Sequence, residues 1–236
     1  MYNSILVIPD LHCPAQHIDA FTFIKEVAKL YKPDKIVCLG DELDYHCLSF
    51  HENEVDDMPY SESTEFEAGK RYFSNMYDMF DEVDILESNH GSMVFRKARS
   101  CRIPRDFLKT YSEVLDAPPG YKWHKDLVLE TPLGPVKFTH GNYAPKSSLK
   151  KSQLRAMSQV QGHYHNDFAI EYWQNDSGQL FFGMTSGCLI DDEKYAFAYN
   201  KTYIARPLLG CSIIYEGVPE LIPMILDEDK RWIGKL

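Results

Sequence analysis

The sequence has few cysteines, and none of them forms a closely spaced pair. Six cysteines are spread singly over 236 residues, and several lie in apolar runs such as those around Cys38 and Cys211. Structural disulfides are rare in reducing compartments, and C-x-x-C pairs are typical of zinc or redox sites. We therefore expect buried thiols, and neither a disulfide framework nor a cysteine-held metal is predicted.

Long apolar runs and a basic leader are also missing. No stretch of about 18 apolar residues occurs. The N-terminus, MYNSILVIPDLH, has no positively charged start before a long apolar segment. With 44% hydrophobic and 13% aromatic residues, the composition is that of a globular protein with a well-filled core. The sequence predicts a soluble, cytoplasmic protein that is not attached to a membrane.

The sequence has fewer basic than acidic residues. The chain has 25 Lys and Arg residues against 35 Asp and Glu, which gives a formal net charge of -10. This balance disfavours a protein that coats nucleic acid through its whole surface. It leaves room for a local basic groove, or for a site in which metal ions supply the positive charge.

The order of the apolar segments predicts an α/β fold. Two short β-branched runs, Ile5–Ile8 and Lys35–Leu39, enclose apolar residues with helical spacing from Ile18 to Tyr31, which is typical of a parallel strand–helix–strand unit. A helix over Phe66–Phe80 and a strand over Val83–Leu86 follow. Beyond residue 120 we expect strands around the Pro132–Pro135 turn, a short helix over Ser148–Met157, and strands over Phe168–Trp173, Leu180–Met184, Cys211–Tyr215 and Leu221–Ile225. The whole chain, residues 1–236, is predicted to be one domain with two sheets and helices outside them.

Polar side chains follow the predicted strands in five places. Ligands gather outside the carboxyl ends of the strands in open α/β sheets. Mixed imidazole and carboxylate ligands suit Zn, Mn or Fe better than Ca or Mg, and two ions about 3.5–4 Å apart need a carboxylate between them. The five motifs are Asp10-x-His12, Gly40-Asp41-x-x-Asp44, Asn89-His90, His140-Gly141 and Gly162-His163-x-His165. The pattern therefore predicts binuclear metal hydrolysis.

In order and residue type, these motifs resemble those of the calcineurin-like metallophosphoesterases over about residues 5 to 165. The resemblance implies a four-layer α-β-β-α sandwich of two mixed β-sheets flanked by helices. It also implies two divalent metal ions, manganese first and zinc or iron as alternatives, and attack on a phosphoester by a metal-bridging hydroxide. Carried over to matching positions, it implies a first metal on Asp10, His12 and His165, a bridging Asp41, and a second metal on Asn89, His140 and His163.

The same resemblance implies catalytic roles for His90 and Asp44. His90 would lie beside the substrate, as a general acid for the leaving oxygen or as a stabiliser of transition-state charge. Asp44 would orient His90 through a hydrogen bond between carboxylate and imidazole.

Three positions depart from the family pattern. Ser88 stands where the family usually has Gly, and Gly91 stands where it has an acidic residue. Tyr45 occupies the position of an Arg that grips phosphate in the protein-phosphatase branch, which disfavours a protein phosphatase. A phosphodiesterase acting on nucleotides or nucleic acid, a nuclease included, is the favoured function. A phosphomonoesterase or serine/threonine protein phosphatase is the alternative, and a non-catalytic metal-binding module is the alternative of another class.

Two clusters of basic residues have two interpretations each. The segment Val94–Arg105 holds five basic residues and follows His90 closely. It predicts either phosphate binding, through Arg96 and Arg99 with help from Tyr45, or a solvated helix face. For the second cluster the solvated face is favoured; it comprises Lys146, Lys150, Lys151 and Arg155.

Two further segments are less informative. The acidic stretch His51–Ser63 is either a lid over the site or a loop. The segment Tyr195–Tyr203 and the strand near Gly210 resemble the ends of small metallophosphoesterases encoded by phages and prophages, and the tyrosines there either stack on a base or pack in the core.

Overall fold

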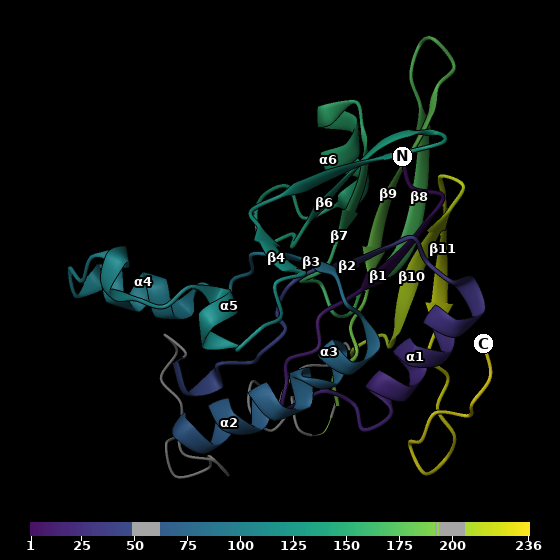
Figure 1. Cartoon of the computed structure of the whole chain (residues 1–236). Coiled ribbons are helices and arrows are strands. Elements are labelled where there is room, and N and C mark those ends of the chain that lie inside the picture. The colour runs from purple at the N-terminus through teal and green to yellow at the C-terminus, as the bar shows by residue number, and fades with distance from the viewer. Residues whose placement is uncertain (49–61, 192, 194–205) are drawn as a thin grey trace.

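The computed structural model describes residues 1–48, 62–191, 193 and 206–236. The acidic stretch from His51 to residue 61 and the segment Tyr195–Tyr203 therefore lie outside the described residues. The described chain forms two β-sheets, one of six strands and one of five, which lie beside each other in Figure 1.

The six-stranded sheet has the order β11-β10-β1-β2-β3-β4. Its centre is parallel from β1 to β4, and β10 joins β1 in the antiparallel direction. The predicted parallel strand–helix–strand start is thus present. The strands are β1 (Ser4–Ile8), β2 (Lys35–Cys38), β3 (Val83–Leu86), β4 (Tyr121–His124), β10 (Gly210–Tyr215) and β11 (Val218–Pro223).

The five-stranded sheet has the order β5-β6-β7-β9-β8. Its three central strands are parallel to one another, and the two edge strands are antiparallel to their neighbours. Both sheets are therefore mixed. The strands are β5 (Leu127–Thr131), β6 (Gly134–Thr139), β7 (Ser158–Gln161), β8 (Phe168–Gln174) and β9 (Leu180–Ser186).

Alternation along β1 shows how the layers are built. Successive side chains of a strand point to opposite faces. Leu6 and Ile8 pack in a core shared with the helices, whereas Ile5 and Val7 pack in a second core with strands of the other sheet. Since both faces are covered, every residue of β1 is buried.

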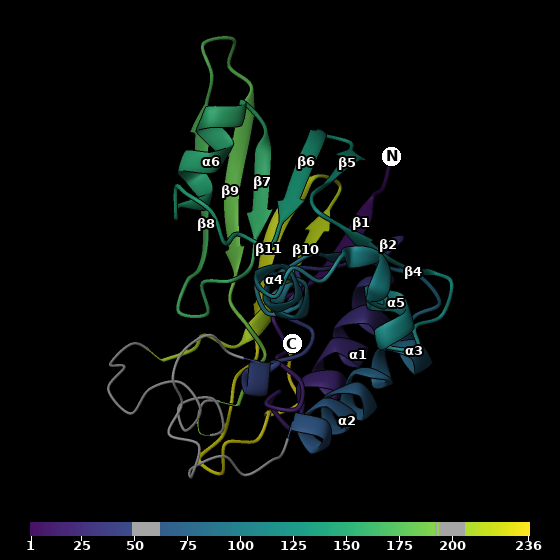
Figure 2. The same ribbon diagram turned by 90° about the vertical axis from the view of Figure 1, so that its left-hand side faces the viewer.

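Helices cover the outer face of each sheet. On the six-stranded side lie α1 (Ala20–Tyr31), α2 (Glu62–Phe73) and α3 (Asn75–Met79), and on the five-stranded side lies α6 (Ser148–Arg155). Figure 2 shows the two sheets between these groups of helices. The predicted α-β-β-α fold class is confirmed.

Four other short helical segments complete the described elements, and one predicted helix differs from the structure. The remaining helices are α4 (Met93–Ser100), α5 (Tyr111–Val114) and the two 3-10 helices η1 (His46–Leu48) and η3 (Arg105–Phe107). The helix predicted over Phe66–Phe80 is split into α2 and α3 at Ser74, whose hydroxyl donates to the Arg71 carbonyl. A hydroxyl that bonds the preceding turn in this way favours a helix break.

Among the described residues, no helix combines the length and the apolar character needed to span a bilayer.

Candidate metal centre

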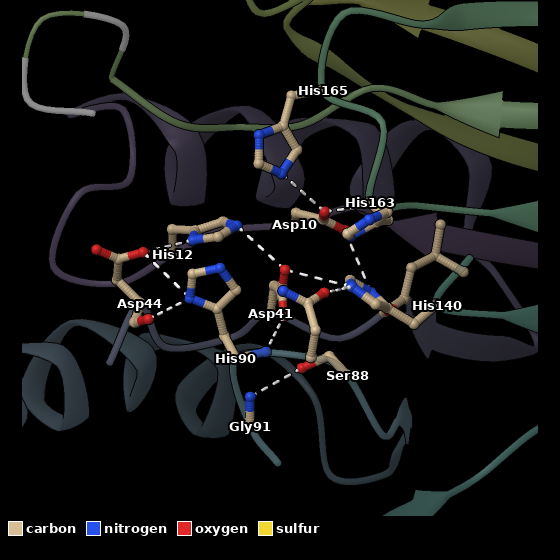
Figure 3. A network of polar contacts seen from close by, with 12 residues as sticks. Asp10, His12, Asp41, Asp44, Ser88, His90, Gly91, His140, His163 and His165 are labelled. Carbon is tan, nitrogen blue, oxygen red and sulfur yellow. Dashed lines mark hydrogen bonds and ion pairs between the residues drawn. The ribbon is translucent and has the colours of Figure 1, made fainter. Parts of the chain in front are cut away.

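The carboxyl ends of β1, β2, β3, β6 and β7 meet at one place between the two sheets. Backbone hydrogen bonds tie the loops that leave these ends. The His12 N–H donates to the Asp41 carbonyl over 2.8 Å, and the Gly162 N–H donates to the His140 carbonyl over 2.9 Å. All five predicted motifs are thereby brought together, as Figure 3 shows for their side chains.

One group of side chains joins the loops after β1, β2 and β7. Asp10, His12, Asp41 and His165 each offer one donor atom, and these atoms lie within 4.8 Å of one another. Nε2 of His165 is 3.0 Å from Oδ2 of Asp10, and Nε2 of His12 is 3.3 Å from Oδ2 of Asp41. These are the residues that the family resemblance assigns to the first metal and the bridge.

A second group shares Asp41 and adds His140 and His163, again with donor atoms within 4.8 Å. Nε2 of His140 is 3.3 Å from Oδ2 of Asp41 and 2.6 Å from Oδ1 of Asn89. The structure therefore gathers the residues assigned to the second metal, and Asp41 lies between the two groups.

The outer nitrogens of two imidazoles are held by acceptors outside these groups. Nδ1 of His12 is 2.7 Å from Oδ1 of Asp44, and Nδ1 of His140 is 2.9 Å from the Leu39 carbonyl oxygen. Since these atoms accept, each Nδ1 donates its hydrogen, and Nε2 faces the centre, where it offers a lone pair once it has lost its proton. Metal-ligating histidines usually have this arrangement.

The backbone is strained where it enters the centre. His12, Asp41 and His163 have φ values of 50°, 47° and 68°. The left-handed region costs a non-glycine residue on the order of 1–3 kcal/mol and persists where the surroundings enforce it. A Cβ on Gly162 would lie 2.4 Å from Oδ1 of Asp10, so only glycine lets this loop approach the carboxylate.

The donors fit a divalent metal ion. Oδ1 of Asp10 is buried and makes no hydrogen bond within the part of the chain that the structure describes. A buried carboxylate oxygen in that state is costly unless a cation binds it. The mixed nitrogen and oxygen donors are those that Mn, Zn and Fe accept.

The pKa values of the side chains in the two groups also indicate a cation site. Burial opposes protonation of His12, but contacts with Asp41 and Asp44 outweigh it and raise its pKa from 6.5 to about 10. Burial likewise opposes protonation of His140, and the Asp41 carboxylate raises its pKa to about 9. Burial disfavours ionised Asp41, yet the neighbouring imidazoles hold its pKa well below the usual range. The centre therefore attracts positive charge.

His90 lies beside the first group, with a partner that differs in part from the prediction. Its ring is 4.5 Å from that of His12, and its backbone N–H donates to Oδ1 of Asp41 over 3.1 Å. Nδ1 of His90 hydrogen-bonds the backbone carbonyl of Asp44 and lies 3.5 Å from Oδ1 of Asp44. The Asp44 carboxylate makes its short hydrogen bond to His12 instead, because the loops after β1 and β2 run side by side.

The two departures near His90 have a structural basis. The Ser88 hydroxyl accepts a hydrogen bond from the Gly91 N–H over 3.1 Å, which closes the turn around His90. A Cβ on Gly91 would lie 3.4 Å from the Tyr111 ring and 3.9 Å from Oε1 of the buried Glu42. An acidic side chain at this position would therefore bring a second carboxylate towards Glu42, which glycine avoids.

The three predicted substrate contacts are placed differently from one another. Arg96 is exposed, and Nη2 of its guanidinium donates to the Asn89 carbonyl over 2.7 Å. Arg99 is exposed one turn further along α4. Tyr45 is only 6% exposed and its ring stacks on Phe66, so its side chain belongs to the core and does not offer the substrate contact that was predicted.

Lys151 is a buried residue that links two loops of the centre. The sequence favours a solvated helix face for its cluster, but Lys151 is fully buried. Its Nζ donates to the Gly141 carbonyl over 2.8 Å and to Oε1 of Gln161 over 2.7 Å, which ties together the loops that carry His140 and His163. Helix α6 buries Ser148, Lys151 and Ser152 and exposes Leu154, so its polarity is the reverse of the usual pattern.

Solved structures with a similar chain path include proteins from three sources. A novel archaeal phosphodiesterase is 12% identical, with a TM-score of 0.49 and coverage of 93% of this chain and 99% of that one. Vacuolar protein sorting 29 from Cryptosporidium parvum is 15% identical, with a TM-score of 0.45 and coverage of 93% and 95%. The phosphoesterase Yfce from E. coli is 17% identical, with a TM-score of 0.47 and coverage of 99% and 98%. No protein-family model and no curated protein matches the chain.

The raised pKa values predict that metal binding releases protons. Near neutral pH the metal-free protein holds protons on His12 and His140, with pKa values of about 10 and 9, and a metal ion needs both imidazoles deprotonated. Binding should therefore release about two protons, and affinity should fall as the pH is lowered. Calorimetric titration with Mn²⁺ in two buffers of different ionisation enthalpy measures the number. Binding without proton release would contradict the two pKa assignments.

Replacement of the shared Asp41 carboxylate should weaken metal binding by both groups. We expect Asp41→Asn to lose most of its bound metal, because the amide removes a negative charge from both groups at once. Elemental analysis after dialysis measures the metal content. Glu42→Gln is the matched control: Glu42 is also buried, but it hydrogen-bonds Trp123 and belongs to neither group, so this variant should keep its metal. Two tightly bound ions in Asp41→Asn would refute the bridging assignment.

Proposed function

We propose that this protein is a binuclear-metal-dependent phosphoesterase, and that phosphodiesters of nucleotides or nucleic acid are its substrates. The observation that carries the proposal is the pair of His/Asp groups that share the buried Asp41 at the joined ends of the two sheets. Asp10, His12, Asp41 and His165 would hold one ion, and Asp41, Asn89, His140 and His163 the other. Two such ions would supply an activated water and a clamp for the phosphoryl oxygens.

His90 is the residue that we assign to the leaving group. Its Nδ1 faces the carbonyl and carboxylate oxygens of Asp44, which fixes the hydrogen on Nδ1 and directs Nε2 away from Asp44. When His90 is protonated, Nε2–H can be given to the leaving oxygen as the ester bond breaks. Asp44 supports this charged form, although burial of the ring lowers the pKa of His90.

The absence of a phosphate-gripping arginine after Asp44 supports diesters over phosphoproteins. Tyr45 holds that position, and its ring is packed on Phe66 in the core. A dianionic monoester needs more positive charge at the phosphoryl group than a monoanionic diester does. The guanidinium of Arg96, which lies beside the centre, donates a hydrogen bond to the Asn89 carbonyl.

A comparison of two aryl esters tests the substrate class. In Mn²⁺ we expect hydrolysis of bis-p-nitrophenyl phosphate to exceed that of p-nitrophenyl phosphate, measured as kcat/KM for the released nitrophenolate. A clear preference for the monoester would favour the phosphomonoesterase or protein-phosphatase alternative. Bound metal with no hydrolysis of either ester would favour the non-catalytic metal-binding module.

Replacement of His90 separates proton donation from charge stabilisation. His90→Ala should keep the metal content of the parent and lose roughly 10²-fold or more in kcat on a dinucleotide, whose alkoxide leaving group needs a proton. The loss should be much smaller on bis-p-nitrophenyl phosphate, since nitrophenolate leaves without one. His124→Ala is the control, because His124 on β4 pairs with Asp84 on β3, outside the centre. Equal losses on both esters would show that His90 stabilises charge only, and unchanged turnover would remove it from catalysis.

A further inference from the structure

Residues 93 to 110 form an element that we call the basic arm: α4, the turn after it and η3. The arm has one acidic residue, Asp106, so its net charge is +5 in a chain of net charge -10, and the other residues together carry -15. In Figure 1, α4 extends away from both sheets. A positive element on an otherwise acidic protein selects polyanions locally. The six basic residues of the arm are Arg96, Lys97, Arg99, Arg102, Arg105 and Lys109.

The arm starts at the metal centre. The Met93 N–H at the start of α4 donates to the His90 carbonyl over 2.9 Å. One turn later Arg96 donates to the Asn89 carbonyl. The first turn of the arm therefore lies directly beside His90 and Asn89.

The far part of the arm has a defined shape. The guanidinium of Arg105 lies 3.8 Å from the centre of the Phe95 ring, and the Ile103 N–H donates to the Ala98 carbonyl over 2.9 Å. The chain then enters α5 through a capping box between Thr110 and Glu113. These contacts hold the arm's backbone in place relative to the centre.

An aromatic ring is exposed among these cations. Phe107 is 80% exposed, and it lies between Arg105 and Lys109 in the sequence. A solvated helix face gains nothing from an exposed phenylalanine. Rings interleaved with cations are the platforms on which unpaired bases stack while the backbone phosphates are neutralised.

We propose that the basic arm binds single-stranded nucleic acid and leads it to the metal centre. Its cations contact successive phosphates, and Phe107 stacks on one base. This inference rests on the proposed function, since it names the substrate class of the same site. Single strands fit better than duplexes, because the bases of a duplex are already stacked and offer Phe107 no free face.

Salt dependence tests the cations. The probe is a labelled oligothymidylate of about 16 nucleotides, and its binding is followed by fluorescence anisotropy in the full-length His90→Ala protein with Mn²⁺ to suppress cleavage. The triple variant Arg99→Ala, Arg102→Ala, Lys109→Ala should bind more weakly, and its slope of log K against log salt should flatten by about 2, at roughly 0.7 per phosphate contact. The matched triple variant replaces the exposed Lys25, Lys122 and Lys125 by Ala and should bind as the parent does.

Base stacking tests Phe107. Phe107→Ala should weaken oligothymidylate binding by about 10-fold, the scale of one stacked base, and Phe107→Trp should restore it. On an abasic oligomer of the same length, neither change should have an effect. Circular dichroism of each variant checks that the fold is kept.

Several outcomes would overturn the arm's role. They are equal losses in the two triple variants, equal losses from Phe107→Ala on thymidylate and abasic oligomers, and tighter binding of a duplex or of phosphatidylserine vesicles than of the single strand. Hydrolysis of bis-p-nitrophenyl phosphate by the parent tests the proposed function separately. A parent that hydrolyses this ester but binds no strand refutes the arm alone, whereas arm-dependent binding without hydrolysis refutes the phosphoesterase function alone.

Discussion

The buried carboxylate of Asp41 is the group on which the rest of the structure depends. It is 1% exposed, its Oδ2 lies 3.3 Å from the imidazoles of both His12 and His140, and its Oδ1 accepts from the His90 backbone. Burial of a charge is costly unless it is paired. The strand ends of both sheets supply its partners. The charge of Asp41 is therefore fully paired only when the two sheets pack together, and the same packing assembles the centre.

Crowding around Asp41 also explains the unusual backbone. A Cβ on Gly40 would lie 2.6 Å from the Leu86 carbonyl, and one on Gly162 would meet Asp10. His12, Asp41 and His163 accept positive φ values in the same loops. The apolar cores on both faces of β1 hold the strands that impose these conformations, so stability gained in the core is spent on the geometry of the centre.

The two helices next to the centre, α6 and α4, direct their polar side chains in opposite ways. Helix α6 turns Ser148, Lys151 and Ser152 inwards, and Lys151 joins the two loops that bear His140 and His163. On the other side, α4 turns its arginines outwards. The first arrangement joins the two loops of the centre, and the second places positive charge beside it in a protein of net charge -10.

The sequence by itself determined the strands, the fold class and the residues that gather at the centre. Continuous β-branched runs such as Ile5–Ile8 are recognisable because both faces of a central strand are buried, and polar residues at strand ends meet because parallel strands share an edge. Only the tertiary structure decided that the Asp44 carboxylate bonds His12, that Tyr45 is packed on Phe66, and that Lys151 is buried. These contacts depend on how loops and helices from separate parts of the chain lie against one another, and no local periodicity records that arrangement.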